Sequence, residues 1–209
     1  MNADNIDALF SEAPLIAILR GVQPEQVVAY GKAIVDSGWR CIEVPLNSPS
    51  PLESIRNLYD YFGDSILTGA GTVLSAADVK AVVSAGGKLI VAPNTDASVV
   101  TEALAHNAVI MPGFLSATEA FQAYAYGARY LKLFPADAMG PAYIKAIRSV
   151  LPADARIIPV GGVTPDNLQA FREAGSAAFG VGSQLFKPGM SVDEVRARAE
   201  DFMSACKVR

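Results

Sequence analysis

Eight short apolar runs alternate with amphipathic stretches from one end of the chain to the other. Successive runs begin roughly 19 to 27 residues apart, which leaves room for one helix between each pair. The repeated order of strand then helix favours a parallel sheet that is covered by helices. The predicted strands lie at residues 15–19, 41–46, 66–71, 89–93, 108–113, 130–135, 157–162 and 177–182.

No linker rich in Pro, Gly or Ser interrupts this alternation. We therefore predict that residues 1–209 form a single domain, an α/β fold of the closed (β/α)8 TIM barrel type with a short N-terminal helix. The alternative is a doubly wound open sheet, which carries a glycine fingerprint in its first strand-to-helix turn. The first turn here, Leu19-Arg20-Gly21-Val22-Gln23-Pro24, lacks that fingerprint, so the barrel is favoured.

Several helix starts are marked by a serine three positions before a glutamate. This spacing occurs at Ser50 to Glu53, Ser116 to Glu119 and Ser191 to Glu194. It predicts capping boxes, in which the serine hydroxyl and the glutamate carboxylate bond each other's backbone amides.

Composition excludes several classes of protein. The chain is 51% hydrophobic and 18% charged, which excludes disorder, and its net charge of -4 gives no basic surface for nucleic acid. The segment Met1 to Leu9 carries acids where a secretory signal carries basic residues, and the apolar run at 15–19 is too short to span a bilayer. Cys41 and Cys206 are interpreted as reduced thiols. We predict a cytoplasmic protein without nucleic-acid or membrane partners.

Two charged residues stand inside apolar runs. Lys132 interrupts Tyr130-Leu131-Lys132-Leu133-Phe134-Pro135, and Glu43 interrupts Cys41-Ile42-Glu43-Val44-Pro45-Leu46. Lysine is almost never fully buried without compensation, and desolvation lowers the pKa of an amine toward the range in which it attacks a carbonyl.

Barrel geometry relates these two charges. The second and sixth strands of a barrel lie across from each other, so Glu43 and Lys132 can share an interior layer. A buried ion pair is a poor source of stability, which favours a catalytic pair. The alternatives are a structural ion pair, or a lysine whose amine reaches solvent while its stem is buried.

Further candidate residues follow the first four strands, at the C-terminal ends where this fold places its active sites. They are Arg20, Asn47, Thr72 and Pro93. Arg20 is suited to hold a carboxylate with two hydrogen bonds, or it pairs with a neighbouring helix at the rim. Thr72 is suited to contact a small ligand, or it caps a helix.

Glycine-rich turns follow the last two strands, where this fold commonly binds phosphate. They are Val160-Gly161-Gly162-Val163-Thr164 and Gly180-Val181-Gly182-Ser183. Glycines let backbone amides approach an anion closely, and a helix N-terminus adds favourable partial charge. We predict a phosphate site here; the alternative is that the glycines only relieve crowding in tight turns.

Metal and histidine chemistry are disfavoured. His106 is the only histidine, so neither a histidine-based triad nor a zinc cluster can be assembled, and Glu43 alone would not hold a hard cation. We predict no metal and no cofactor.

Six motifs together resemble one family, the pyruvate-forming aldolases that cleave 2-keto-3-deoxy-6-phosphogluconate, its galactonate epimer and 4-hydroxy-2-oxoglutarate. The resemblance covers nearly the whole chain. The motifs are Ile16-Ala17-Ile18-Leu19-Arg20-Gly21, Glu43-Val44-Pro45-Leu46-Asn47-Ser48-Pro49, Gly69-Ala70-Gly71-Thr72-Val73-Leu74, Pro112-Gly113, Leu131-Lys132-Leu133-Phe134-Pro135 and Val160-Gly161-Gly162-Val163.

The resemblance implies a role for each candidate residue. Lys132 would be the Schiff-base lysine of a class I aldolase and Glu43 its acid and base. Arg20, Thr72 and Pro93 would surround the pyruvate moiety, and Gly161, Gly162, Gly182 and Ser183 would bind the phosphate of a phosphorylated keto acid. The resemblance also implies a homotrimer.

Two positions bear on which C4 epimer is cleaved. In the family resembled, the gluconate branch tends to have threonine before the Gly-Gly pair and arginine after the leucine of the second strand. This chain has Val160 and Asn47 there, as in the galactonate branch. Valine cannot hydrogen-bond a hydroxyl, so we predict a preference for 2-dehydro-3-deoxy-6-phosphogalactonate.

Other functions stay open from the sequence. The chain could instead cleave the gluconate epimer or 4-hydroxy-2-oxoglutarate. It could be another phosphate-binding barrel, such as a sugar-phosphate epimerase, in which Lys132 only donates hydrogen bonds. It could also be a barrel that binds a phosphorylated acid without turnover.

Overall fold

The structure is a computed structural model that describes residues 3–207, with side chains described from residue 6 onward. The predicted limits of the domain, and the segment Met1 to Leu9, therefore lie partly outside the described residues. The predicted N-terminal helix is present as α1 (Ala3–Glu12).

All strand pairs are parallel, as predicted, and they form two sheets. The larger sheet has the order β5-β4-β3-β2-β1-β9, and the smaller has the order β6-β7-β8. The strands are β1 (Leu15–Ile18), β2 (Cys41–Pro45), β3 (Leu67–Gly71), β4 (Leu89–Val91), β5 (Val109–Met111), β6 (Gly113–Phe114), β7 (Tyr130–Leu133), β8 (Arg156–Pro159) and β9 (Phe179–Val181).

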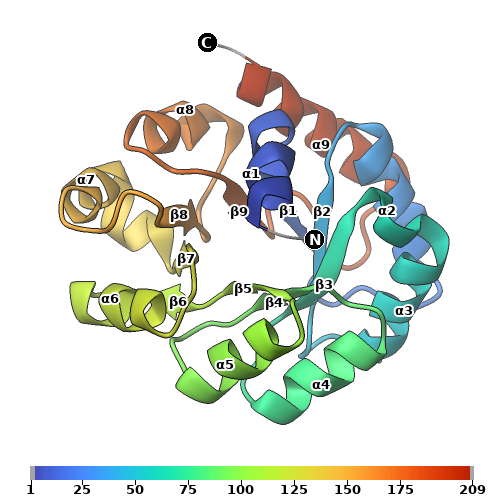
Figure 1. The fold of residues 1–209 in the computed structure, drawn as a ribbon. Coiled ribbons are helices and arrows are strands. Elements are labelled where there is room, and N and C mark those ends of the chain that lie inside the picture. Colours follow the sequence, from blue (N-terminus) through green and yellow to red (C-terminus); the bar gives the residue numbers. More distant parts are fainter. Residues whose placement is uncertain (1–2, 208–209) are drawn as a thin grey trace.

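A helix follows each of the predicted strands, and the helices surround the sheets. In Figure 1, α2 to α9 form a ring around the strands, while α1 lies inside that ring. Besides α1, the elements are α2 (Val27–Asp36), α3 (Pro51–Phe62), the 3-10 turn η1 (Gly63–Ser65), α4 (Ala76–Ser84), α5 (Ala97–Ala105), α6 (Ala117–Ala125), α7 (Ala136–Arg148), α8 (Pro165–Glu173) and α9 (Val192–Lys207).

The predicted fifth strand is divided in two by Pro112. Proline has no backbone N–H to donate to a neighbouring strand, and Pro112 separates β5, which pairs with β4, from β6, which pairs with β7. Its carbonyl still accepts a hydrogen bond of 2.9 Å from the backbone amide of Lys132, in β7. At the other edges of the two sheets, an isolated parallel bridge joins Val160, just after β8, to Gly180 of β9.

Side-chain alternation gives the sheets an outer and an inner apolar cluster. In β2, Ile42 and Val44 belong to the outer cluster, which packs against the helices, whereas Cys41 belongs to the inner cluster. The inner cluster comprises Ile6, Phe10, Ile16, Ile18, Cys41, Leu67, Leu89, Val91, Val109, Met111, Tyr130, Ile158, Val160 and Ala178. Glu43 and Lys132 share the strand faces of Cys41 and Tyr130, so both point inward.

Two of the three predicted capping boxes are confirmed and one is wrong. Ser116 and Ser191 each exchange hydrogen bonds with the glutamate three residues later. Ser50 makes no side-chain cap, because its backbone adopts the left-handed region with φ 37°, and Pro51 occupies the first turn instead.

Cys41 and Cys206 are both free thiols, and Cys41 is buried. In the described part of the chain, none of the helices combines the length and the apolar character that a membrane span requires.

Candidate active site

Glu43 and Lys132 are both buried on the inner faces of their strands. Lys132 lies in β7, where its Cα pairs with Gly113 of β6 and Ile158 of β8. Glu43 lies in β2 between Ile18 of β1 and Gly69 of β3. Only 2% of Glu43 and 7% of Lys132 is exposed. Glu43 lies at the middle of its strand, and Lys132 lies in the C-terminal half of its strand.

The pKa values of this pair are shifted toward neutrality. Burial raises the pKa of Glu43 to about 7, against the opposing charges of Lys132 and Arg20 and the backbone amide of Gly71. Burial also lowers the pKa of Lys132; the charge of Glu43 opposes this shift and that of Arg20 adds to it. A carboxyl group near pKa 7 can both accept and donate a proton at neutral pH, and a lysine with a lowered pKa is more often neutral.

The carboxyl group of Glu43 has an unfilled hydrogen-bonding position. Its Oε2 is buried without a hydrogen-bond partner, and no direct ion pair with Lys132 is found among the described side chains. A structural ion pair would bring the amine of Lys132 into direct contact with this carboxylate. This argues against a structural ion pair.

Gly71 makes room for that carboxyl group. A Cβ atom at position 71 would lie 1.9 Å from Oε2 of Glu43 and 2.4 Å from its Cδ. Any side chain there would displace the carboxylate. The glycine at the end of β3 is therefore required by the position of Glu43.

Arg20 and Asn47 form a pair at the rim. Nη1 of Arg20 donates a hydrogen bond of 2.5 Å to Oδ1 of Asn47, which joins the turns after β1 and β2. The charge of Arg20 also acts on both Glu43 and Lys132. Its guanidinium thus stands at the entrance to the buried pair, where it can meet an anionic group of a ligand.

A cavity of about 560 Å³, lined in part by Arg20, opens at the C-terminal ends of β1, β8 and β9. Six of the residues predicted for the site line it: Arg20, Val160, Gly161, Gly162, Gly182 and Ser183. Gly161 and Gly162 have φ values of 96° and 71°, which L side chains rarely adopt. The two glycine-rich turns therefore meet at one cavity wall.

The other predicted site residues do not line that cavity: Glu43, Lys132, Asn47, Thr72 and Pro93. Thr72 follows Gly71 directly and has φ 57°, an uncommon conformation for a β-branched residue that is often found at functional sites. The carbonyl of Pro93 packs against Gly113, the Cα partner of Lys132. Both are therefore close to residues that touch the buried pair.

Three residues that belong to this region are not among those predicted from the sequence. The Nζ atom of Lys132 lies 4.9 Å from the ring centroid of Phe134, which also lines the cavity. Lys187 contributes a cation to the same wall. The third is Gly71, whose requirement follows only from the approach of Glu43. Gly71 and Phe134 stand inside quoted motifs, but no sequence signal marks Lys187.

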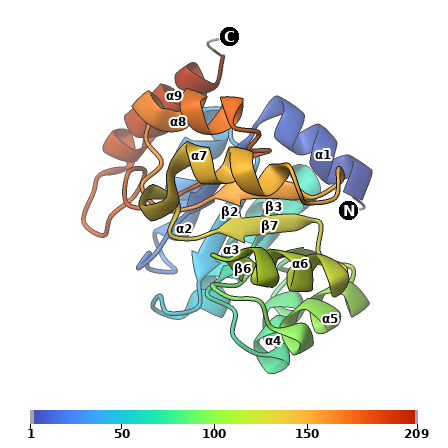
Figure 2. The ribbon, with the colours of Figure 1, turned by 90° about the vertical axis from the view of Figure 1, so that its left-hand side faces the viewer.

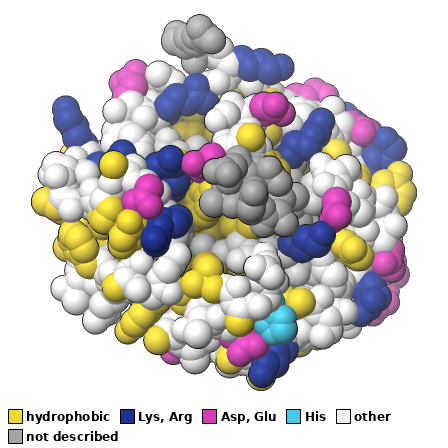
Figure 3. Space-filling view, viewed as in Figure 1, with side chains coloured by type: hydrophobic (Ala, Val, Ile, Leu, Met, Phe, Trp, Pro, Cys, Tyr) yellow, Lys and Arg dark blue, Asp and Glu magenta, His cyan; other side chains and the backbone are white. Residues whose placement is uncertain are grey.

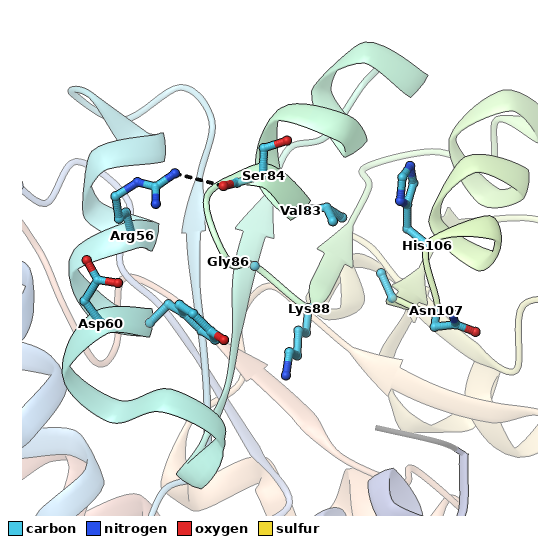
Figure 4. Close-up of a pocket in the computed structure, with 11 residues that line it drawn as sticks. Arg56, Asp60, Val83, Ser84, Gly86, Lys88, His106 and Asn107 are labelled. Carbon is cyan, nitrogen blue, oxygen red and sulfur yellow. Dashed lines mark hydrogen bonds between the residues drawn. The ribbon is translucent and has the colours of Figure 1, made fainter.

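A second cavity, of about 370 Å³, lies at the other end of the strands (Figure 4). It contains none of the predicted site residues. Three of its polar side chains already have partners: Lys88 pairs with Asp64, Nε2 of His106 lies 2.9 Å from Glu102, and Arg56 donates to the carbonyl of Ser84. His106 follows α5 as its C-cap.

Comparison with known proteins decides which family has this arrangement. The family model described as KDPG and KHG aldolase matches residues 6–200. The chain belongs to the KDPG and KHG aldolase family. Among the relatives of this aldolase is the 2-dehydro-3-deoxy-6-phosphogalactonate aldolase of Escherichia coli strain K12, which is 45% identical over 93% of this chain and 95% of the relative.

Two further comparisons place this aldolase within its family. The 2-dehydro-3-deoxy-phosphogluconate aldolase of Pseudomonas aeruginosa is 33% identical over 78% of this chain and 74% of the relative. A solved structure described as native KDPGal superimposes with a TM-score of 0.92 and 44% identity, covering 94% of this chain and 95% of the other. The galactonate-type relative is thus the more similar of the two enzymes.

Proposed function

We propose that this chain is a Schiff-base aldolase that cleaves 2-dehydro-3-deoxy-6-phosphogalactonate to pyruvate and D-glyceraldehyde 3-phosphate. The observation that carries the proposal is the buried Lys132 with a lowered pKa, facing a Glu43 whose pKa is raised to about 7. Membership of the aldolase family and the 45% identity to an enzyme of that name support it.

The chemistry assigned to the pair begins with Lys132. Its neutral amine attacks the C2 ketone, and Glu43 assists the loss of water that converts the carbinolamine to an iminium. Glu43 then takes the proton of the C4 hydroxyl. The C3–C4 bond breaks, its electrons enter the iminium to form an enamine, and C4 leaves as the aldehyde. Protonation at C3 and hydrolysis release pyruvate and free Lys132.

The remaining candidate residues bind the two ends of the substrate. Arg20, with Thr72 and Pro93 nearby, would hold the pyruvate moiety, and the backbone amides of the two glycine turns would bind the phosphate. The iminium accepts the electrons of the breaking bond, which is the role that a metal ion would otherwise have, so we propose a reaction without metal or cofactor.

Val160 and Asn47 are assigned to the choice of epimer. Val160 lines the cavity, and its side chain packs against Gly180, where a Cβ would lie 2.6 Å from Cγ2. Threonine has nearly the same shape as valine but adds a hydroxyl that could bond the C4 hydroxyl of the other epimer. Asn47 stands where the gluconate branch tends to have arginine. Its side-chain oxygen accepts a hydrogen bond from Arg20, so Arg20 has no second arginine beside it at this position.

Steady-state kinetics with both epimers test the proposal. We expect the galactonate epimer to have the higher kcat/KM by about tenfold or more, and Val160→Thr to reduce that ratio. Equal or better kcat/KM with the gluconate epimer would overturn the substrate assignment. Lys132→Ala should abolish both adduct formation and pyruvate release from both epimers; pyruvate release that persists in this variant would show that the cleavage does not require Lys132.

We also propose that the two sheets form one closed (β/α)8 barrel in a single domain. Two observations support this. Only one residue, Pro112, separates β5 from β6, and the bridge from Val160 to Gly180 links β8 to β9. If β5 and β6 count as one strand, eight strands enclose the inner cluster.

A homotrimer is the proposed assembly. Large apolar side chains remain exposed around α6, at Leu115, Phe121 and Tyr126, and Figure 3 shows hydrophobic side chains gathered over α6 and α7 at the left edge. Sedimentation velocity should give about three times the chain mass of 21.9 kDa; a species of one chain mass would contradict this. The cytoplasmic location stays a prediction.

A further inference from the structure

Strand β7 carries two inward polar side chains. Tyr130 begins the strand and Lys132 follows two residues later, so both lie on the same face. Tyr130 belongs to the inner cluster, whereas Leu131 and Leu133 belong to the outer one. Tyr130 therefore occupies the layer next to Lys132 on the side of the strand N-termini.

Helix α1 packs against that layer. The ring of Phe10 meets the ring of Tyr130 edge-on, with centroids 5.9 Å apart and an interplanar angle of 71°. Ile6 and Phe10 are 1% and 4% exposed and are members of the inner cluster. Figure 1 shows α1 inside the ring of helices, and Figure 2 shows it at one end of the strands.

A polar link fixes the helix to two strands at once. Oδ1 of Asp7 accepts a hydrogen bond of 2.8 Å from the hydroxyl of Tyr130, and Oδ2 accepts one of 3.0 Å from Arg156. Tyr130 and Arg156 are Cα partners at the first positions of β7 and β8. Because Asp7 and Arg156 are partly exposed, the ion pair is weak, and most of the closure comes from Ile6 and Phe10.

The shifted pKa values of the pair depend on its burial. Burial is the first cause of the shifted pKa values of Glu43 and Lys132. The charged groups that act on Lys132 are Glu43 in β2 and Arg20 in the turn after β1. The charge of Glu43 also raises the pKa of Cys41. At the C-terminal ends the cavity admits ligand. At the N-terminal ends, α1 supplies the covering side chains.

We propose that α1 is a positioning element of the active site: Phe10, seated on Tyr130, closes the N-terminal end of the interior and keeps water away from Lys132 and Glu43. This inference rests on the proposed Schiff-base function. Phe10, Asp7 and Tyr130 touch no substrate and act through Lys132. Helix α1, which is not part of the strand–helix repeat, would thus set the protonation state of Lys132.

Phe10→Ala tests this inference, with Phe171→Ala as the matched control. Both phenylalanines are buried, but Phe171 lies on α8 in the outer cluster. The readout is the rate at which pyruvate and borohydride form the reduced Lys132 adduct, measured from pH 6 to pH 10. If water enters, the pKa of Lys132 rises toward its ordinary value, so fewer amines are neutral at pH 7.

We expect the Phe10→Ala rate to fall about tenfold at pH 7, as for a rise of one pKa unit, and to approach the wild-type rate near pH 10. Phe171→Ala should change the rate by the same factor at every pH. If either variant fails to fold, Phe10→Leu and Phe171→Leu provide the same comparison with a smaller expected shift.

Two results must be distinguished. A rate that falls by one factor at all pH values in the Phe10 variants would overturn the role of α1, because loss of structure alone gives that result. A wild-type protein that forms no adduct at any pH would overturn the proposed function itself.

Discussion

Single residues decide whether the buried pair can react. Glu43 and Lys132 were predicted from sequence because a charge inside an apolar strand is unusual wherever the strand lies. Gly71 and Phe134 were not, since their roles depend on how close Glu43 and Lys132 approach them in space. Residue type and spacing identify a reactive group, but not the neighbour that must leave room for it.

Gly71→Ala is expected to disable the acid and base without removing the nucleophile. Its Cβ would lie 1.9 Å from Oε2 of Glu43, so the carboxylate must move. We expect kcat to fall by about a hundredfold or more, since general acid and base catalysis contributes roughly 10² to 10⁴. Initial-rate kinetics measure this loss.

The matched control is Gly63→Ala, where an added Cβ meets nothing within 4 Å. That variant should retain kcat, although its positive φ of 54° makes some loss of stability expected. Wild-type kcat in Gly71→Ala would show that Glu43 does not need its present position.

Elements set the positions of these residues, and their boundaries were largely predictable. Apolar runs located each strand, and the serine–glutamate spacings located three helix starts, because both are local signals. Ser50 was the exception: its spacing to Glu53 matched a capping box, but the left-handed turn after β2 directs its hydroxyl elsewhere. Division of the fifth strand at Pro112 was also visible only in the pairing of β5, β6 and β7.

Cap substitutions measure this difference between helices. Ser116→Ala removes the hydroxyl that accepts from the amide of Glu119, so it should destabilise the protein by about 1 kcal/mol. Ser50→Ala removes no such bond and should cost less than half as much. Urea denaturation of both variants gives the comparison. Equal losses would mean that the side chain of Ser50 caps α3 in solution.

At the scale of the whole molecule, the fold keeps two charges in an apolar interior. Alternating strands and helices predicted the parallel α/β architecture, and the predicted C-terminal ends carry the candidate site. The contribution of α1 was not foreseeable, because helical periodicity gives no sign that Ile6 and Phe10 pack on the inner rather than the outer face. Which end of an interior is covered depends on tertiary packing.

The cost of this burial should appear in the pH dependence of stability. The folded-state pKa of Glu43 is raised from 4.5 to about 7, so its contribution is fully present below pH 4.5 and is lost as pH rises through 7. The pKa of Lys132 is lowered from 10.5, so its contribution is present above pH 10.5 and is lost as pH falls through the folded value.

Glu43→Gln removes the contribution of the Glu43 carboxyl group to the pH dependence of stability, since glutamine stays neutral. Relative to wild type, we expect the variant to gain stability between pH 4.5 and pH 8, by up to about 3 kcal/mol at 1.4 kcal/mol per pKa unit. Urea denaturation at both pH values measures it, and Glu53→Gln on the exposed face of α3 controls for loss of a negative charge. A difference that does not change with pH would contradict the raised pKa.

The central claim is that the buried amine of Lys132 forms an imine with a 2-keto acid. Wild-type protein treated with pyruvate and borohydride should gain the mass of one reduced pyruvate per chain, and peptide mapping should place it on Lys132. Lys132→Arg keeps a cation at this position but should gain no such mass. An unmodified wild-type chain, or an adduct on any other lysine, would contradict the account.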